Sequence, residues 1–319
     1  MSDLIKPYKP GMTIDRPCAV ADMPDDFYHA DPCPTPSLSG TTAFKMVQPG
    51  GPALVKEDKG HPEKPKPTMI EGTAAHAIVL GAGKQLIADE YITDAGRQST
   101  KKEAKEWRAA QQAAGFQVVV PELLERANAM KQAIKAHPEA GPLLEGGIPE
   151  LSIFYHDDVN GVWLRGRIDY LRDRKTVIDY KTTTLHGAEP RQVNRAIPDR
   201  GYHIQAAHYM HIAKRLGIID DDATYHLIVQ ERQAPYRIAT IELTPLTLGT
   251  GEKERQQAVE LWKTCNTTDE WPSLPTETRK FDLPIWYKPE LQEQVLEELN
   301  SAEQAAKEFD ELIKENKAA

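Results

Sequence analysis

Cysteine is scarce in this chain. The 319 residues include three cysteines, Cys18, Cys33 and Cys265, which are far apart in the sequence. A disulfide framework needs several pairs of cysteines, and a four-cysteine metal cluster needs one more thiol than the chain has. Both classes of protein are therefore excluded, and we expect the three cysteines to be ordinary thiols.

Long apolar runs and a secretion signal are also missing. No stretch approaches the roughly 18 apolar residues that a membrane-spanning helix needs. The N-terminal sequence MSDLIKPYKP lacks the apolar core of a signal peptide. Hydrophobic residues make up 40% of the chain, which is typical of a globular protein with a real core. We expect a cytoplasmic protein with no membrane segment.

The chain also lacks an excess of positive charge. The formal net charge is −9, whereas non-specific DNA binding usually requires a basic domain. The charge is uneven, however: Gly161–Arg200 contains nine Lys or Arg and five Asp or Glu, and Lys288–Ala319 contains four Lys and nine Asp or Glu. A basic region at 161–200 is expected, although the simplest explanation of each single arginine there is ordinary surface charge.

The most informative motif lies in that basic region. Residues 166–184 read GRIDYLRDRKTVIDYKTTT and contain Asp169, Asp179 and Lys181 in the pattern D-x9-D-x-K. Segments 163–171 and 176–182 are rich in β-branched and aromatic residues, and a short charged stretch separates them. This pattern predicts two antiparallel strands, so the motif is expected on a β-hairpin.

The register of the hairpin decides what the motif can do. Side chains alternate between the faces of a strand, so Asp179 and Lys181 share a face. A loop of three or five residues places Asp169 opposite Asp179, whereas a loop of two or four places the carboxylates on opposite faces. We predict the odd-length loop. Facing like charges are unfavourable unless a cation lies between them, and oxygen ligands favour Mg2+ or Mn2+ over zinc.

The lysine of the motif lies one pleat beyond the second carboxylate. Lys181 would orient or help to deprotonate a water molecule, or hold a phosphate oxygen as charge develops in the transition state. For the DYK tripeptide taken alone, a charged pair on a solvent-facing strand is the commoner explanation. Other residues therefore have to support the metal-site interpretation.

Three further segments supply such residues. Residues 68–82 predict an apolar helix carrying His76, although a lone histidine there is more often a hydrogen-bonded core residue. Glu150 precedes the alternating sequence LSIFYHDD, and is either part of the site or a plain strand-edge side chain. Gln205 and Tyr209 share a face of a predicted helix at 202–214, although Tyr209 could simply belong to the core.

The order of these motifs resembles that of the RecB-like branch of the PD-(D/E)XK nucleases. Along the chain they are GTAAH, Glu150, GRID, DYKTT and the Q-x-x-x-Y of Gln205 and Tyr209. The chain resembles still more closely the nuclease domain of exonuclease VIII (RecE-type) and its phage relatives, from FYHADPCPTPSLSGTTAF at 27–44 to LPIWY at 283–287. The resemblance implies an α/β fold with a PD-(D/E)XK restriction-endonuclease-like core, which is a mixed central sheet with flanking helices.

The resemblance also implies roles for individual residues. Asp169 and Asp179 would be metal ligands together with the backbone carbonyl of Tyr180. Lys181 would be the catalytic lysine, His76 would act beside the metal or handle protons, and Glu150 would be a further catalytic carboxylate. Substrate-binding roles are expected for Gln205, Tyr209, Arg165 and Arg167.

The implied activity is Mg2+-dependent exonucleolytic digestion of linear double-stranded DNA from 5′ to 3′, with Mn2+ able to substitute. It leaves 3′ single-stranded tails for a RecT-type annealing protein, in a bacterial or phage-infected cell. A ring-shaped tetramer around the duplex is also implied. The alternatives are an endonuclease or a repair or restriction nuclease of the same superfamily, and a catalytically silent DNA-binding assembly protein.

The expected organisation has three parts. Residues 1–67 form a Pro- and Gly-rich segment that wraps the core, and residues 68–288 form the nuclease domain, mainly helical up to residue 144. Within that domain we expect strands at 223–230 and 236–243 and a helix at 247–264. Residues 289–319 predict an acidic amphipathic helix, which either packs on its own core or contacts another copy or a basic partner.

Overall fold

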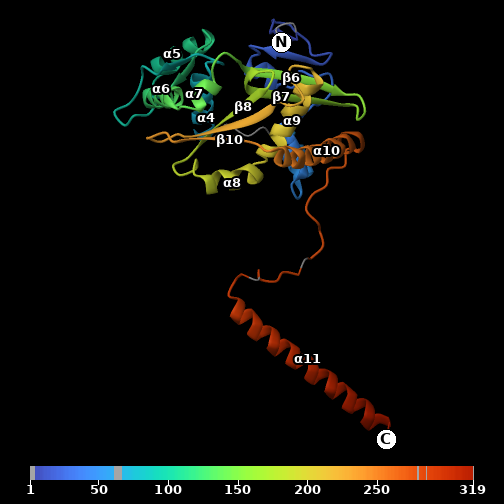
Figure 1. The fold of residues 1–319 in the computed structure, drawn as a ribbon. Helices are drawn as coiled ribbons and strands as arrows, with labels where there is room; N and C mark the ends of the chain where they lie inside the picture. Colours follow the sequence, from blue (N-terminus) through green and yellow to red (C-terminus); the bar gives the residue numbers. More distant parts are fainter. Residues whose placement is uncertain (1–3, 61–66, 279, 285, 319) are drawn as a thin grey trace. The chain divides into compact units, whose positions relative to one another are not determined.

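The computed structural model describes residues 4–60, 67–278, 280–284 and 286–318 (Figure 1). The chain forms two compact units, Met1–Leu274 and Pro275–Ala319. In the predicted N-terminal segment, residues 1–3 and 61–66 lie outside the described part.

The first unit is built on a mixed sheet of eight strands. Its order is β1-β2-β6-β7-β8-β9-β10, with β3 paired to β7. The β6–β7, β7–β8 and β9–β10 pairs are antiparallel, and β8–β9 is parallel. The strands are β1 Ile5–Pro7, β2 Cys18–Ala21, β3 Leu38–Ser39, β6 Ile148–Asp157, β7 Val162–Asp173, β8 Thr176–Thr183, β9 Thr224–Glu231 and β10 Ile238–Glu242.

The β7–β8 hairpin confirms the predicted strands but not the predicted loop. Arg174 and Lys175 alone separate the two strands, so the expected odd-length loop is wrong. The register shifts between Leu171 and Asp173, which leaves one extra residue in β7. This β-bulge has the same effect on register as an odd loop, because an extra residue moves the following side chains to the other face.

Helices cover both faces of this sheet (Figure 1). One core cluster joins side chains of the sheet to α2, α9 and α10, and another joins the sheet to α4, α6 and α7. Proline occupies the first turn of α6, α8 and α10, where its missing N–H costs no hydrogen bond. The helices are α2 Gly40–Val47, α4 Pro67–Leu80, α6 Pro121–Ala136, α7 Ala140–Leu143, α8 Pro190–Asp199, α9 Tyr202–Arg215 and α10 Pro245–Thr268.

The N-terminal segment is part of the folded unit. Its strand β2 pairs with β6, and the short helix α1 (Asp25–His29) follows. Tyr28 packs with Phe154 and Trp163 of the sheet in a separate apolar cluster. Helix α3 (Gly51–Gly60) ends this part of the described chain. The segment therefore supplies the strands at one edge of the sheet, and β3 pairs with β7, the strand in which the D-x9-D-x-K motif begins.

The region predicted to be mainly helical also contains a small second sheet. Strands β4 (Leu86–Ala88) and β5 (Gln117–Val119) are parallel and flank helix α5 (Lys102–Ala113). Leu86, Val119 and Leu123 pack with α4 in their own cluster. This small sheet therefore supports α4, which carries His76.

The second unit contains helix α11 (Pro289–Ala318), in agreement with the predicted C-terminal helix. Leu291, Val295 and Leu299 on this helix are 53%, 52% and 61% exposed. The division into three domains stays a prediction. No helix among the described residues is long and apolar enough to cross a membrane.

Candidate active site

Three carboxylates occupy facing positions on adjacent strands. In the β6–β7 ladder, Pro149 pairs with Tyr170 and Leu151 with Ile168, which leaves Glu150 opposite Asp169. In the β7–β8 ladder, Tyr170 pairs with Ile178, so the next position brings Asp169 opposite Asp179. The predicted facing arrangement of Asp169 and Asp179 is therefore present, although a bulge produces it.

The strands separate where these carboxylates lie. The regular β7–β8 pairs end at Tyr170 and Ile178, and the Tyr180 N–H donates to Asp169 Oδ2 at 2.8 Å. Glu150 has a φ of 49°, in the left-handed region that non-glycine residues rarely adopt. Such strained backbone is often found at functional sites. The opened ladder gives the side chains room to converge.

His76 completes a group of three possible metal ligands. Its Nδ1 lies 3.9 Å from Glu150 Oε1 and 3.7 Å from Asp169 Oδ2. One ligand atom from each of the three residues lies within 4.8 Å of the others. Burial lowers the pKa of His76, but the negative charges of Asp169 and Glu150 outweigh this effect, so the pKa lies above its usual value. The imidazole is thus held among negative charges.

Asp179 is paired with Lys181. Lys181 Nζ lies 2.7 Å from Asp179 Oδ2, and the Asp179 side chain is 1% exposed. Burial and the charge of Asp169 raise the pKa of Asp179 to about 6, although Lys181 acts in the opposite direction. Burial lowers the pKa of Lys181, but the negative charges of Asp179 and Asp169 raise it by more. The pKa of Lys181 is therefore above its usual value.

This donor set fits a divalent cation. Two carboxylates and one imidazole converge at one point, with a third carboxylate beside them, and Lys181 is the basic side chain in ion-pair contact with Asp179. Buried carboxylates in one place repel one another, and a bound cation relieves that repulsion. Glu150, Asp169 and His76 would hold the ion, with Asp179 adjacent.

A cleft of about 740 Å3 opens onto this group. His76, Glu150 and Lys181 line it from the sheet and from α4. Its other walls come from α1, α2, the turn after α4, and the connection between α8 and α9: Asp25, His29, Gly40, Thr41, Phe44, Lys84, Arg200, Gly201 and Tyr202. These wall residues were not predicted as members of the site; the sequence indicated only that residues 1–67 wrap the core.

Gln205 and Tyr209 lie together, as their spacing predicts. Gln205 Nε2 donates to Tyr209 Oη at 2.9 Å, and Gln205 lines the cleft. Tyr209 is 7% exposed and packs against Gly166, where an added Cβ would lie 2.7 Å from Tyr209 Cδ1. The glycine of GRID therefore allows α9 to approach β7 closely. Within this arrangement, Tyr209 braces Gln205 from the core.

Arg165 and Arg167 hold the N-terminal segment against β7. Arg165 Nη1 donates to the Tyr28 carbonyl at 2.8 Å, and Arg167 Nη2 donates to the Met23 carbonyl at 3.0 Å. Arg167 also pairs with Asp25 and lines the cleft, whereas Arg165 is not among the lining residues. Their predicted contact with substrate stays a prediction, and their observed partners give both a structural role.

Comparisons with known proteins agree with this picture. Residues 41–279 match the model of a family described as "PDDEXK-like domain of unknown function (DUF3799)". No curated protein matches. Among solved structures, a "Putative exonuclease" from Eubacterium rectale is 12% identical with a TM-score of 0.50, covering 78% of this chain and 91% of that one.

Two other solved structures match with lower TM-scores. A phage-related exonuclease from Haemophilus somnus 129PT is 16% identical, with a TM-score of 0.31 over 61% of this chain and 95% of that one. An alkaline exonuclease from Laribacter hongkongensis is 14% identical, with a TM-score of 0.28 over 61% and 90%. The family match and the Eubacterium rectale structure confirm the predicted fold class and the resemblance to PD-(D/E)XK domains.

Proposed function

Because the chain belongs to the family of PDDEXK-like domains designated DUF3799, we propose that it is a divalent-metal-dependent nuclease that cleaves phosphodiester bonds in DNA. The observation that carries the proposal is the convergence of His76, Glu150 and Asp169 beside the Asp179–Lys181 pair, at the floor of an open cleft. A cluster of carboxylates with one lysine, reached from solvent, suits hydrolysis of an anionic substrate.

Each residue of the site would have a distinct role in the reaction. Glu150, Asp169 and His76 hold the metal ion, which when bound supplies an acidified water and neutralises phosphate charge. Lys181 lies beside them and stabilises negative charge on the phosphate oxygens. Asp179 keeps the lysine ammonium in place through the 2.7 Å contact. Gln205, braced by Tyr209, faces the cleft and orients the phosphate backbone.

The finer proposal concerns substrate and direction. We infer Mg2+ as the working ion, since oxygen ligands dominate the set, with Mn2+ able to replace it. The resemblance to RecE-type domains supports digestion of linear double-stranded DNA from 5′ to 3′, leaving 3′ tails for an annealing protein. The same resemblance supports a ring-shaped tetramer, with DNA ends as the partner that the cleft receives.

Digestion of labelled DNA tests this proposal. Linear duplex carrying a label at one 5′ end or one 3′ end is incubated with the full chain in Mg2+ or in EDTA. Early release of the 5′ label in Mg2+ alone is expected. A covalently closed circle of the same sequence should remain intact, and its cleavage would instead show an endonuclease. No digestion of any DNA in Mg2+ or Mn2+ would contradict the proposal and favour a DNA-binding assembly protein.

A further inference from the structure

A second cavity borders the cleft at Lys181. It has a volume of about 340 Å3 and runs between the end of β8 and helix α8. Lys181, Arg200 and Tyr202 line both cavities. The remaining lining includes Thr182, Thr183, Thr184, Gln192, Arg195 and Asp199. We call this second cavity the α8 groove. Lys181, Arg200 and Tyr202 therefore form a border that the cleft and the α8 groove share.

One positive charge in the α8 groove is not balanced by a neighbour. Lys181 is paired with Asp179, and Arg195 Nε lies 3.1 Å from Asp199 Oδ2. The side chain of Arg200 is exposed and makes no hydrogen bond or ion pair with any residue that the structure describes. Arg200 therefore presents a free guanidinium where the two cavities meet.

The backbone fixes the position of this arginine. Gly201 has a φ of 66°, and an added Cβ there would lie 2.2 Å from Phe44 Cδ2, so the connection between α8 and α9 needs glycine. This tight connection places Arg200 at the end of α8 and Tyr202 at the start of α9. Lys181 Nζ lies 5.2 Å from the centre of the Tyr202 ring. Arg200 is thus attached to the element that contacts the proposed catalytic lysine.

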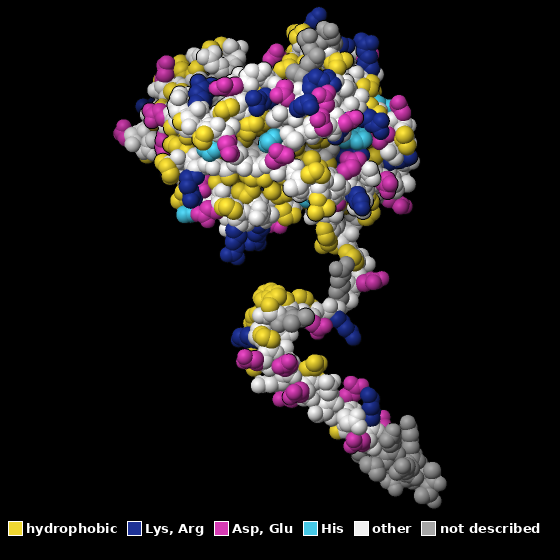
Figure 2. Space-filling view, viewed as in Figure 1, with side chains coloured by type: hydrophobic (Ala, Val, Ile, Leu, Met, Phe, Trp, Pro, Cys, Tyr) yellow, Lys and Arg dark blue, Asp and Glu magenta, His cyan; other side chains and the backbone are white. Residues whose placement is uncertain are grey.

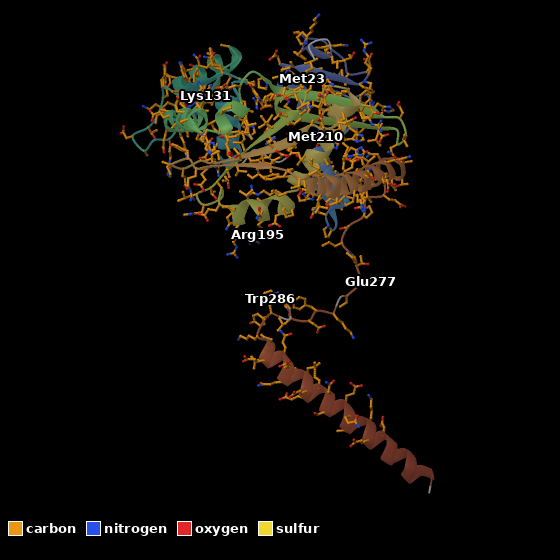
Figure 3. All side chains as sticks on the ribbon, in the orientation of Figure 1. Met23, Lys131, Arg195, Met210, Glu277 and Trp286 are labelled. Atoms are coloured by element: carbon orange, nitrogen blue, oxygen red, sulfur yellow. The ribbon has the colours of Figure 1, made fainter. Side chains whose placement is uncertain are left out.

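The rest of the α8 groove combines polar side chains with His186 and with the apolar Leu185, Val193, Ala196 and Val229. The hydroxyl groups of Thr182, Thr183 and Thr184 make no hydrogen bond within the described residues, and neither does the amide of Gln192. Hydroxyl and amide groups commonly contact the phosphate and sugar oxygens of DNA. Figure 2 shows Lys and Arg side chains gathered at the edge below α8, and Figure 3 shows Arg195 extending outward there.

We propose that the α8 groove is a second subsite for the sugar–phosphate backbone of the cleaved DNA strand, and that Arg200 binds a phosphate next to the scissile one. This inference rests on the proposed nuclease function. A guanidinium forms two parallel hydrogen bonds with phosphate oxygens, which fixes orientation as well as position. Arg200 would therefore position the strand, while the carboxylate group and Lys181 act on the scissile bond.

DNA binding without cleavage tests the subsite. Affinity for linear duplex is measured in EDTA, over salt concentrations of about 50 to 200 mM, for the wild type, Arg200→Ala and Arg191→Ala. Arg191 is the matched control, because it is an exposed arginine of the same helix without a described partner and lines neither cavity. Arg200→Ala should reduce the slope of log affinity against log salt by about one, and Arg191→Ala should leave it unchanged.

Steady-state digestion in Mg2+ provides the second readout. Arg200→Ala should raise KM at least about tenfold, as expected from the loss of charge-assisted hydrogen bonds to one phosphate, with little change in kcat. Arg200→Lys should restore the salt slope but only part of the KM, because lysine cannot bind in the same two-pronged way. Equal slopes and equal KM values for Arg200→Ala and Arg191→Ala would overturn the inference. A wild type that binds but does not digest DNA would contradict the proposed function alone, since the binding experiment needs no cleavage.

Discussion

Lys181 Nζ lies 2.7 Å from Asp179 Oδ2, and this pair stands next to the group formed by His76, Glu150 and Asp169. The ammonium group of Lys181 is held by Asp179, and Lys181 still lines the cleft, where it can contact a substrate. Asp179 is thereby more closely associated with Lys181 than with the three-residue group, although Asp169 and Asp179 occupy facing positions on β7 and β8.

Removal of the lysine should stop catalysis. Lys181→Ala is expected to lower kcat on linear duplex at least about 100-fold, as found when a transition-state charge partner is removed. Asp179→Asn and Asp169→Asn should be similarly inactive, with the fold retained by circular dichroism. The matched control is Lys175→Ala, because Lys175 belongs to the same hairpin but pairs with Asp222 at an exposed position. Lys181→Ala activity close to that of Lys175→Ala would refute the site assignment.

Metal affinity should depend on the carboxylate of β6. Glu150→Gln removes one charged oxygen ligand from the three-residue group and is expected to weaken Mn2+ binding at least about tenfold. Isothermal titration calorimetry without DNA measures this directly. Glu145→Gln is the control, since Glu145 is exposed and precedes the same strand. Equal Mn2+ affinities for the two variants would exclude Glu150 as a ligand.

The Tyr180 side chain should contribute to stability. Its Oη donates to Gln230 Oε1 at 2.6 Å, and Gln230 Nε2 donates to the Met130 carbonyl at 3.0 Å. Tyr180→Phe leaves a buried acceptor without its donor, which should lower the free energy of unfolding by roughly 1–3 kcal/mol. Urea denaturation at neutral pH provides the measurement. An unchanged unfolding midpoint would show that Gln230 finds another donor.

Stability should fall in mild acid because of His208. This side chain is fully buried, and its Nε2 donates to the Arg165 carbonyl at 3.0 Å. Burial, followed by the charge of Arg255, lowers the pKa of His208 to about 3. His208 therefore becomes protonated near pH 6.5 in the unfolded chain but only near pH 3 in the folded chain. The free energy of unfolding consequently decreases as the pH falls from 6.5 toward 3.

The expected size of this loss is roughly 2 kcal/mol between pH 7 and pH 5 for one such histidine. Other groups also titrate in this range, so the comparison is with His208→Gln, which retains a side-chain donor but does not titrate. Urea denaturation of both proteins at the two pH values measures the difference. Equal pH dependence in the two proteins would show that His208 takes up its proton without unfolding.

The hairpin and its neighbours were predictable because their signals are local. β-branched and aromatic residues indicated β7 and β8, and the alternating sequence after Glu150 indicated β6. The loop length was not predictable in the same way, because a bulge at Arg172 and a two-residue turn give the same facing of Asp169 and Asp179 as an odd loop. Side-chain alternation constrains register, and several turn geometries satisfy it.

The rest of the site depends on contacts between distant parts of the chain. His76 reaches Glu150 and Asp169 only because α4 packs on the sheet beside them. The walls contributed by Asp25, Gly40 and Tyr202 come from segments without a chemical motif. Helix α8 contains Pro198, which in a sequence suggests an earlier end to a helix. Strands β4 and β5 are each three residues long, too short for a clear periodic pattern.

The location of a bound ion tests the metal site most directly. Crystals of the full chain soaked in Mn2+, with data collected at the manganese absorption edge, would reveal the ion by its anomalous scattering. A peak within coordination distance of the Glu150 and Asp169 carboxylates and the His76 imidazole is expected, and Asp169→Asn crystals should lose it. A peak only outside the cleft, or none at millimolar Mn2+, would contradict the assignment of these residues as the metal centre.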